Sequence, residues 1–292
     1  MIEIKGTTRV CGLIGNPVGH SISPLIHNTL AEMCHVDMAY VTFQVEKNQV
    51  KEAATGAYAL NILGLNVTVP HKQKVLDSLV DVDPLAKAIG AVNTLVRTED
   101  GFKGYNTDIL GLQRELEDEG ISLAGQKVII LGAGGASRAI AFLCAKEGAA
   151  VVYLLNRTVV KAQQIADDVN LHFNKECVVP LAIDAYDKIP GDGYVTIQTS
   201  SVGLYPNCDQ AVIEDETFYK KVEVGVDIIY NPVKTKFMEL VEHQGKSAYN
   251  GLKMLLYQGI SAFELWNDMH VSTQEAAVVY EKMKRELGIN EA

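Results

Sequence analysis

Hydroxyl, amide, ammonium and carboxylate side chains gather in four short stretches of the first 110 residues. These stretches are residues 15–24 (GNPVGHSISP), 64–72 (GLNVTVPHK), 90–94 (GAVNT) and 104–108 (GYNTD). Each alone has an ordinary structural explanation, such as a helix cap at Ser23 or a solvated side chain at Lys72. Together they combine hydroxyls, amides, one Lys and one Asp, which is the chemistry of a site for a small, polyhydroxylated, anionic molecule.

A glycine-rich turn at residues 132–137 (GAGGAS) is the most informative single motif. It follows an apolar run at 127–131 and precedes an apolar segment with helical spacing. Gly132 suits a tight turn, and Gly134 lets the backbone approach a pyrophosphate that faces the helix N-terminus. Ser137 stands where Gly or Ala is usual. The alternative is a tight structural turn, but the strand, turn and helix context favours dinucleotide binding.

The end of the next apolar run indicates which dinucleotide would bind. An Asp or Glu there accepts hydrogen bonds from the ribose 2′-OH of NAD, whereas a 2′-phosphate needs a cation. The chain has Asn156, Arg157 and Thr158 at this place, with Lys161 one helical turn later. Arg157 could hold the phosphate through charge-assisted hydrogen bonds, so NADP is favoured. A solvated arginine at a strand end is the alternative.

The elements that must carry these motifs alternate along the chain. Short β-branched runs predict strands near 9–15, 38–45, 62–69, 91–97, 127–131, 150–155, 194–198 and 224–229. Helices are predicted from Ser23, which would cap the first one, and near 48–58, 72–80, 107–119, 135–147, 158–169 and 235–244. Such alternation is typical of βαβ units on parallel sheets, so the predicted fold class is α/β.

Two segments concern the domain organisation. Residues 117–126 are polar, contain two glycines and precede a strongly apolar strand, so they are a candidate joint. The tail from Gly251 reads as two helices without a strand between them. Because such a tail cannot extend a parallel sheet, we expect it to pack on the first domain.

Length, charge and cysteine content exclude several classes. A chain of 292 residues favours two domains, and its formal charge of −10 provides no basic field for a nucleic acid or an anionic membrane. Its five cysteines are scattered without metal-ligand spacing, which favours a reducing compartment and no metal site. No apolar run has the length of a signal peptide or a membrane span, so a cytoplasmic location is expected.

Across nearly its whole length the chain resembles the shikimate/quinate dehydrogenase family. The shared strings, in order, are GNPVGHSISP, GLNVTVPHK, GAVNT, GYNTD, GAGGASRA, NRT, DIIYNP and GLKMLLYQ. The resemblance implies two α/β domains: a substrate-binding catalytic domain of residues 1–110 and 251–292, and a Rossmann-type NADP-binding domain of residues 111–250. It also implies reversible, NADPH-dependent reduction of 3-dehydroshikimate to shikimate in the biosynthesis of chorismate and the aromatic amino acids.

The resemblance also assigns roles to individual residues. It implies that Lys72 and Asp108 are the catalytic pair. The implied substrate ligands are Ser21 and Ser23 for the carboxylate, Asn66, Thr68, Asn93 and Gln258 for ring hydroxyls, and Tyr230 at the edge of the site. The implied cofactor ligands are Gly132, Gly134, Gly135 and Ala136 at the pyrophosphate, Asn156, Arg157, Thr158 and Lys161 at the adenosine ribose and its phosphate, and Gly251 and Met254 at the nicotinamide.

The proton chemistry of the implied reaction fits this catalytic pair. Hydride transfer to a ketone leaves an alkoxide, so a general acid must lie within hydrogen-bonding reach of that oxygen. Protonated Lys72 could donate the proton, or it could mainly orient and polarise the carbonyl while Asp108 anchors it. The histidines at 20, 27 and 71 are then not needed for acid–base work.

Two departures from the family pattern are visible, and other functions stay open. Gln198 stands where the family often has Asn, and Lys161 where NADP-using members often have Arg. Quinate, with NAD or with both cofactors, is the alternative substrate, although Ser21 and the absence of an acidic residue after Leu155 favour shikimate and NADP. A non-catalytic nucleotide sensor is the alternative from another class. The oligomeric state is open between a monomer and a homodimer.

Overall fold

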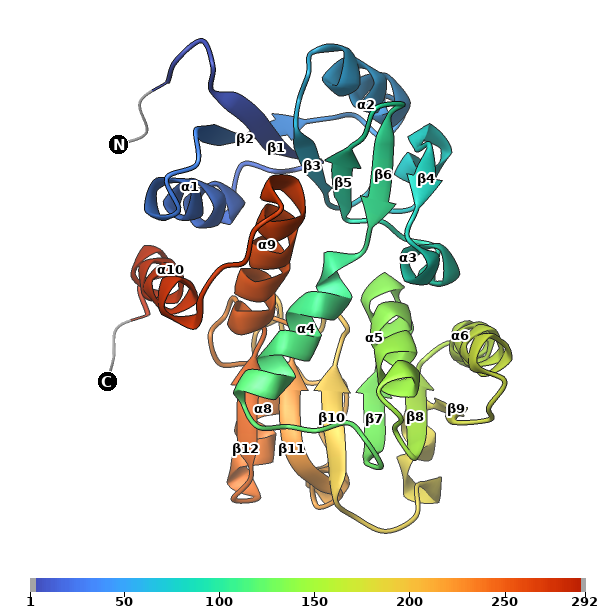
Figure 1. Cartoon of the computed structure of the whole chain (residues 1–292). Helices are drawn as coiled ribbons and strands as arrows, with labels where there is room; N and C mark the ends of the chain where they lie inside the picture. Colours follow the sequence, from blue (N-terminus) through green and yellow to red (C-terminus); the bar gives the residue numbers. More distant parts are fainter. Residues whose placement is uncertain (1–3, 290–292) are drawn as a thin grey trace. The chain divides into compact units, whose positions relative to one another are not determined.

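The computed structural model describes residues 4–289, which form two compact units (Figure 1). The first unit comprises Met1–Gly111 and Leu255–Ala292, and the second comprises Leu112–Met254. The chain passes between them inside two helices, α4 (Thr107–Asp118) and α9 (Leu252–Asn267). The polar segment 117–126 therefore lies within the second unit and is not the joint that its composition suggests.

The first unit is built on a six-stranded mixed sheet in the order β2-β1-β3-β5-β6-β4 (Figure 1). The strands are β1 (Arg9–Gly15), β2 (Met38–Gln44), β3 (Gly64–Val67), β4 (Asp81–Val82), β5 (Thr94–Arg97) and β6 (Phe102–Tyr105). Strand β5 runs antiparallel to both of its neighbours, and the other pairs are parallel. Polar residues at the ends of β3 and β5 consequently meet across one ladder, where Asn66 pairs with Thr94.

The helices of this unit cover the sheet and follow the apolar spacing of the sequence. They are α1 (Ser23–Met33), α2 (Val50–Ala59), the 3₁₀ turn η1 (Lys74–Ser78), α3 (Pro84–Ile89) and α10 (Thr273–Glu286), with most of α9. Helix α10 begins with a capping box between Ser272 and Glu275. The two C-terminal helices without an intervening strand are confirmed, and they belong to the first unit.

The second unit has a wholly parallel sheet in the order β12-β11-β10-β7-β8-β9 (Figure 1). Its strands are β7 (Lys127–Leu131), β8 (Val151–Asn156), β9 (Val178–Ala182), β10 (Tyr194–Gln198), β11 (Val222–Asp227) and β12 (Ser247–Asn250). Numbered along the chain within this unit, the order is 3-2-1-4-5-6, which is that of dinucleotide-binding Rossmann folds. Its helices are α5 (Gly135–Lys146), α6 (Val159–Phe173), η2 (Ile183–Lys188), α7 (Glu216–Tyr219) and α8 (Lys236–His243).

Three local predictions are wrong for identifiable physical reasons. Ser23 does not cap α1: Ile22 is the N-cap, and no side chain bonds there, because Ser23 is already helical. The helix expected near 72–80 is limited to η1, because Val75 is the one buried residue of η1 and the segment lacks an apolar face to pack. The first sheet is mixed rather than parallel, because short hairpin connections join β5 and β6. Among residues 4–289, no helix is both long and apolar enough to cross a membrane.

Candidate active site

Lys72 and Asp108, distant in sequence, form an ion pair in the first unit. Lys72 Nζ lies 2.7 Å from Asp108 Oδ2, and their side chains are 32% and 20% exposed. Partial exposure leaves both groups open to a ligand. Asp108 is the second residue of α4, where the positive end of the helix dipole favours a carboxylate.

The loop that carries Lys72 is anchored on both sides. The carbonyl of Lys72 accepts the amide proton of Val92 at 2.8 Å, and the ring of its neighbour His71 bonds the Val45 carbonyl at 2.8 Å. His71 is fully buried, so it holds the loop and is not available as an acid or base at the surface. The sequence places Lys72 after β3, and these bonds direct it to Asp108.

Asn93 connects the residues of the site, because both the nitrogen and the oxygen of its side-chain amide form hydrogen bonds. Its Nδ2 donates to Asp108 Oδ1 at 2.8 Å, and its Oδ1 accepts the amide proton of Thr107 at 2.7 Å. The hydroxyl of Thr94 also donates to Asn93 Oδ1, at 3.1 Å. Asn93 thus fixes both the start of α4 and the carboxylate that α4 carries.

A continuous hydrogen-bonded chain extends from Asn93 through Thr94 and Asn66 to Tyr40. Asn66 Nδ2 donates to Thr94 Oγ1 at 3.1 Å, and the Tyr40 hydroxyl donates to Asn66 Oδ1 at 2.8 Å. Separately, Ser23 Oγ accepts a hydrogen bond from Ser21 Oγ at 3.1 Å. Four of the residues predicted for the first unit therefore lie on one polar chain, Asn66, Asn93, Asp108 and Lys72, and the two serines form a pair of their own.

Buried side chains outside the predicted set of site residues complete this chain. Tyr40, Thr94 and Thr107 are at most 2% exposed. Thr94 and Thr107 stand within two of the four polar stretches, whereas Tyr40 lies outside all of them. His27 stacks on Tyr40 with ring centroids 4.2 Å apart and an interplanar angle of 16°. Burial lowers the pKa of His27 to about 3, so this histidine is a neutral packing partner.

Two predicted substrate ligands stand apart from the chain. Gln258 donates to the Leu255 carbonyl on its own helix at 3.0 Å. The methyl group of Thr68 lies where a Cβ on Gly15 would clash, at 2.3 Å, so glycine at 15 makes room for Thr68. Their roles as substrate ligands stay predictions.

In the second unit, the glycine turn has two kinds of glycine. Gly132 has φ +121°, and a Cβ there would lie 2.7 Å from Thr199 Oγ1, so the backbone itself requires glycine. At Gly134 and Gly135 a Cβ would meet no atom within 4 Å. These two positions face open space at the N-terminus of α5, where the unsatisfied N–H groups could receive a pyrophosphate. The turn therefore fits the predicted cofactor.

Ser137 has a specific structural role in this turn. It is fully buried, and its Oγ accepts the amide proton of Gly134 at 3.0 Å and lies 2.7 Å from Thr199 Oγ1. Thr199 in turn donates to the Leu131 carbonyl at 2.8 Å. The hydroxyl of Ser137, which stands where Gly or Ala is usual, thus connects the glycine turn to the end of β10.

The predicted 2′-phosphate ligands lie at the end of β8. Arg157, Thr158 and Lys161 are exposed, while Asn156 Nδ2 donates to the Thr158 carbonyl at 3.0 Å. Among residues 4–289, the side chains of Arg157 and Lys161 form no ion pair or hydrogen bond. Both cations are therefore free to bind an anionic group.

Gly251 begins a tightly packed joint between β12 and α9. A Cβ on Gly251 would lie 2.2 Å from the Ile228 carbonyl oxygen, and its amide donates to the Ile229 carbonyl at 3.0 Å. Met254 lies in the first turn of α9 and is partly buried. Tyr230 follows β11 and is also partly buried, which raises the pKa of its hydroxyl.

Gln198, one of the two departures from the family pattern, organises the loop after β10. Its Nε2 donates to the Val202 carbonyl at 3.1 Å and lies 3.4 Å from Asp227 Oδ1. Asp227 is fully buried and also accepts from Thr235 Oγ1 at 2.7 Å. Burial raises the pKa of Asp227 to about 6, against the effect of these donors. The side chain of Gln198, which is longer than the Asn often found here in the family, thus links the loops that follow β10 and β11.

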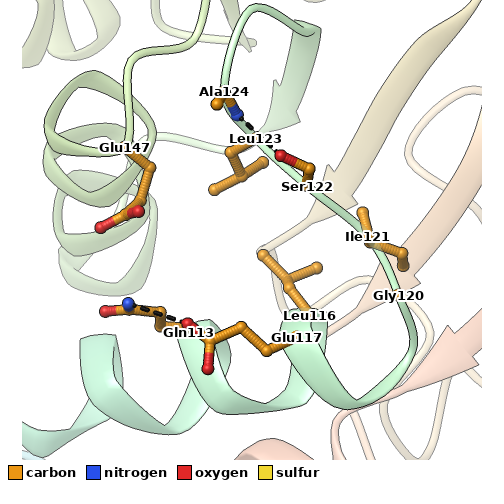
Figure 2. A pocket seen from close by; sticks show the side chains of 9 residues that line it. All are labelled: Gln113, Leu116, Glu117, Gly120, Ile121, Ser122, Leu123, Ala124 and Glu147. Atoms are coloured by element: carbon orange, nitrogen blue, oxygen red, sulfur yellow. Dashed lines mark hydrogen bonds between the residues drawn. The ribbon is translucent and has the colours of Figure 1, made fainter.

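A pocket of about 330 Å³ in the second unit lies apart from these residues (Figure 2). It is enclosed by the end of α4, residues 120–124 and Glu147, with Glu117 and Glu147 on opposite sides (Figure 2). Gln113 Nε2 donates to Glu117 at 3.1 Å beside it. None of the predicted site residues lines it, so it is not the candidate active site.

The strand order and the glycine turn place the second unit in the class of dinucleotide-binding α/β folds. Residues 13–95 match the family model of the shikimate dehydrogenase substrate binding domain, and residues 114–184 match that of shikimate / quinate 5-dehydrogenase. The NADP-dependent shikimate dehydrogenase of Methanobrevibacter smithii is 42% identical over 267 residues, which cover 90% of this chain and 92% of that protein. The chain belongs to the shikimate dehydrogenase family.

Solved structures with the same fold carry more than one activity. A shikimate dehydrogenase in complex with NADP⁺ is 34% identical, with a TM-score of 0.86 over 96% of this chain and 97% of that chain. The ligand-free 5-ketofructose reductase of a Gluconobacter strain is 30% identical, with a TM-score of 0.82 over 96% of this chain and 100% of its own. The substrate must therefore be assigned from the residues of the first unit.

Proposed function

We propose that the protein is an NADP-dependent shikimate dehydrogenase, an oxidoreductase that acts on a CH–OH group. It interconverts shikimate and 3-dehydroshikimate in the biosynthesis of chorismate and the aromatic amino acids. The observation that carries the proposal is the polar chain of the first unit, which joins Lys72 and Asp108 to Asn93, Asn66 and Tyr40 through buried amides and hydroxyls. Such a chain offers a general acid and many hydrogen-bonding groups to one small molecule.

The residues of the second unit support NADP as the cofactor. The N-terminus of α5 and the open positions at Gly134 and Gly135 would hold the pyrophosphate. Arg157 and Lys161 would hold the 2′-phosphate, and Gly251 and Met254 would flank the nicotinamide, which supplies the hydride when bound. The first unit would then be the substrate domain, and the second the cofactor domain.

Lys72 is the proton donor in the reduction. When the ketone carbon accepts the hydride, its oxygen becomes an alkoxide and must take a proton. Lys72 as an ammonium polarises the carbonyl and donates that proton, and it becomes a neutral amine that solvent reprotonates. Asp108 holds Lys72 from one side and is itself held by Asn93. The oxidation of shikimate follows the same steps in reverse.

The substrate assignment is tested by turnover of purified protein with shikimate and with quinate in parallel. NADP⁺ is kept saturating, and the absorbance of NADPH is followed. We expect kcat/KM for shikimate to exceed that for quinate by about tenfold or more, which corresponds to about 1.4 kcal/mol of discrimination. Greater activity on quinate would assign the protein to the quinate branch of the family, and no activity on either would contradict the proposal.

Location and assembly are part of the proposal. All five cysteines are free thiols, which fits a reducing compartment, and we assign the protein to the cytoplasm. The substrate and NADP are its only expected ligands, with no nucleic acid, membrane or metal. A homodimer is the assembly to be tested, by light scattering of the purified protein.

A further inference from the structure

Two consecutive residues of α1 hold Tyr40, the residue of the polar chain that lies outside all four polar stretches of the sequence. The side-chain amide of Asn28 binds its backbone at two points: Oδ1 accepts the Tyr40 amide proton at 2.8 Å, and Nδ2 donates to the Tyr40 carbonyl at 3.0 Å. The His27 ring stacks on the Tyr40 ring, with centroids 4.2 Å apart. Helix α1 therefore fixes both the backbone and the ring of Tyr40.

The Asn28 amide takes the place of a neighbouring strand. Strand β2 is an edge strand of the first sheet, and an edge strand in parallel pairing directs the N–H and C=O of every second residue away from the sheet. These groups need hydrogen-bond partners. Asn28 supplies one acceptor and one donor to Tyr40, as the peptide groups of a further strand would. The position of Tyr40 is thus set by α1 as well as by β1.

The second unit has the same arrangement without an attached site. Asn170 on α6 binds Val178 on the edge strand β9: its Oδ1 accepts the Val178 amide proton at 2.9 Å, and its Nδ2 donates to the Val178 carbonyl at 2.9 Å. The Val178 side chain is apolar and buried, so Asn170 only anchors the strand. Tyr40 differs, because its side chain ends in a hydroxyl that contacts a predicted substrate ligand.

That ligand is Asn66, and the Tyr40 hydroxyl orients its amide. The hydroxyl donates to Asn66 Oδ1 at 2.8 Å. Asn66 Nδ2 donates to Thr94 Oγ1 at 3.1 Å and to the carbonyl of Asn93 at 3.4 Å, so both of its hydrogens are directed to acceptors of the protein. A substrate that reaches this amide therefore meets its oxygen. Such a group binds a hydroxyl, which can donate a hydrogen bond, and not a ketone, which cannot.

We propose that Tyr40, held in place by Asn28, is a positioning residue that fixes Asn66 to accept a hydrogen bond from a ring hydroxyl that does not react. The reacting carbon carries a ketone in one direction of the reaction, so its oxygen finds no donor at Asn66 and belongs at Lys72, which can donate. Tyr40 thereby contributes to the choice of the ring carbon that reacts. The inference rests on the proposed function and on the predicted role of Asn66.

The first test is Tyr40→Phe, which removes the hydroxyl and keeps the ring that packs on His27. A contact with a hydroxyl that does not react is present in both the ground state and the transition state. We therefore expect KM for shikimate to rise about five- to tenfold, while kcat and KM for NADP⁺ stay within about twofold of wild type. Unchanged KM for shikimate would overturn the proposal.

Tyr219→Phe is the matched control for this variant. Tyr219 is fully buried, and its hydroxyl donates to the Ile213 carbonyl at 2.6 Å, so the variant loses a buried hydrogen bond away from the polar chain. We expect a lower unfolding temperature with wild-type kinetics. A rise of KM for shikimate equal to that in Tyr40→Phe would show that lost stability alone raises KM, and the proposal would fail.

A second pair of variants tests the role of Asn28. Asn28→Ala and Asn170→Ala each remove an amide that binds an edge strand at two points, so both should unfold at a lower temperature. We expect KM for shikimate to rise about threefold or more in Asn28→Ala and to stay at the wild-type value in Asn170→Ala. A wild-type KM in Asn28→Ala, or the same rise in both variants, would overturn the assignment of Asn28.

Deoxy analogues of shikimate test which contact Tyr40 supports. Shikimate has two ring hydroxyls besides the one that is oxidised, and 4-deoxyshikimate and 5-deoxyshikimate each lack one of them. For the analogue without the hydroxyl that Asn66 binds, kcat/KM should agree within about twofold between wild type and Tyr40→Phe. For the other analogue, Tyr40→Phe should lower kcat/KM about five- to tenfold, as for shikimate. The same loss with both analogues, or with neither, would overturn the proposal.

Hydrogen exchange of the Asn66 side-chain NH₂, followed by NMR without substrate, gives a readout that does not depend on turnover. We expect exchange about fivefold faster or more in Tyr40→Phe than in wild type, and near wild type in Tyr219→Phe. Unchanged exchange in Tyr40→Phe would overturn the proposal. Inactive wild-type protein would overturn the proposed function instead, while this exchange rate would still decide whether Tyr40 holds Asn66.

Discussion

At the scale of single residues, the amide of Asn93 determines the geometry of the candidate catalytic pair. Its nitrogen faces the Asp108 carboxylate, and its oxygen faces the Thr107 amide and the Thr94 hydroxyl. A flipped amide would set its NH₂ group against the Thr107 N–H and its oxygen against the carboxylate. The network therefore fixes a single orientation, and with it the carboxylate that holds Lys72.

Replacing Lys72 by alanine removes the proposed proton donor. We expect kcat to fall by about 10²- to 10⁴-fold, the usual contribution of a positioned general acid, with a smaller change in KM for shikimate. Steady-state kinetics measures both constants. Lys74→Ala is the matched control, because Lys74 is an exposed lysine two residues away and should keep wild-type kinetics. A defect confined to KM would make Lys72 a binding residue.

Arg157 is expected to determine cofactor preference. In Arg157→Gln, kcat/KM for NADP⁺ should fall about 10- to 100-fold, because one charge-assisted hydrogen bond contributes about 1.5–3 kcal/mol, while kcat/KM for NAD⁺ stays unchanged. The two cofactors are compared at fixed shikimate. Lys188→Gln removes an exposed cation elsewhere in the same unit and serves as the control. Equal losses with both cofactors would mean that Arg157 does not contact the 2′-phosphate.

At the scale of the elements, the glycine turn between β7 and α5 contains one glycine that stability requires and another that cofactor binding is expected to require. Gly132→Ala puts a Cβ 2.7 Å from Thr199 Oγ1 at φ +121°, so it should lower the free energy of unfolding by about 1–3 kcal/mol. Gly135→Ala meets no atom and lies at the helix start, so it should leave stability unchanged or slightly raised, yet weaken NADP⁺ binding. Urea unfolding and fluorescence titration with NADPH measure the two effects. Normal NADPH affinity in Gly135→Ala would place the pyrophosphate elsewhere.

Helix α4 should make stability depend on pH through Glu115. Burial, with the nearby Glu119 carboxylate, raises the pKa of Glu115 from 4.5 to about 8. The folded state therefore binds a proton that the unfolded chain releases, so this contribution is full below pH 4.5 and is lost as the pH rises through about 8. A shift of this size corresponds to roughly 5 kcal/mol.

The matched experiment compares wild type with Glu115→Gln and Glu117→Gln by urea unfolding between pH 5 and pH 9. Glu115→Gln should lose much of the decline in stability over this range, since glutamine does not titrate. Glu117→Gln, an exposed neighbour on the same helix, should keep the wild-type profile. Parallel profiles for wild type and Glu115→Gln would contradict the assignment.

Strongly apolar elements were predictable from sequence, and weakly patterned ones were not. Strands β1, β7 and β8 are mostly apolar and contain β-branched residues, and the structure confirms them. Strand β4 has two residues, and β12 (SAYN) lacks an apolar alternation, so only pairing with β6 and β11 makes them strands. Strand β9 contains Pro180, which lowers strand propensity but is tolerated at a sheet edge.

At the scale of the whole molecule, the sequence predicted the lysine, the aspartate and the two asparagines of the polar chain, but not Tyr40. Ser21 and Lys72 stand in motifs whose chemistry is visible in the letters. Tyr40 lies on an apolar strand, and its partner Asn66 is 26 residues away, so their bond follows only from the register of β2, β1 and β3.

The net negative charge of the chain affects how its anionic ligands are expected to bind. With a net charge of −10, the long-range field opposes binding of both NADP and a carboxylate substrate. The local donors must overcome it: the N-terminus of α5, Arg157, Lys161, Lys72 and the serine pair. Moderate salt should screen this long-range repulsion as well as the attraction to the local donors. Because the two effects oppose each other, KM for both ligands should change less with ionic strength than in a protein with a basic surface.

The most direct test of the central claim is the forward reaction on its own substrate. Purified protein is incubated with 3-dehydroshikimate and NADPH, the loss of NADPH is followed by absorbance, and the product is identified by NMR. The account predicts one shikimate formed for each NADPH consumed, with turnover lowered about 10²- to 10⁴-fold in Lys72→Ala. NADPH left unconsumed, or consumed without the appearance of shikimate, would contradict it.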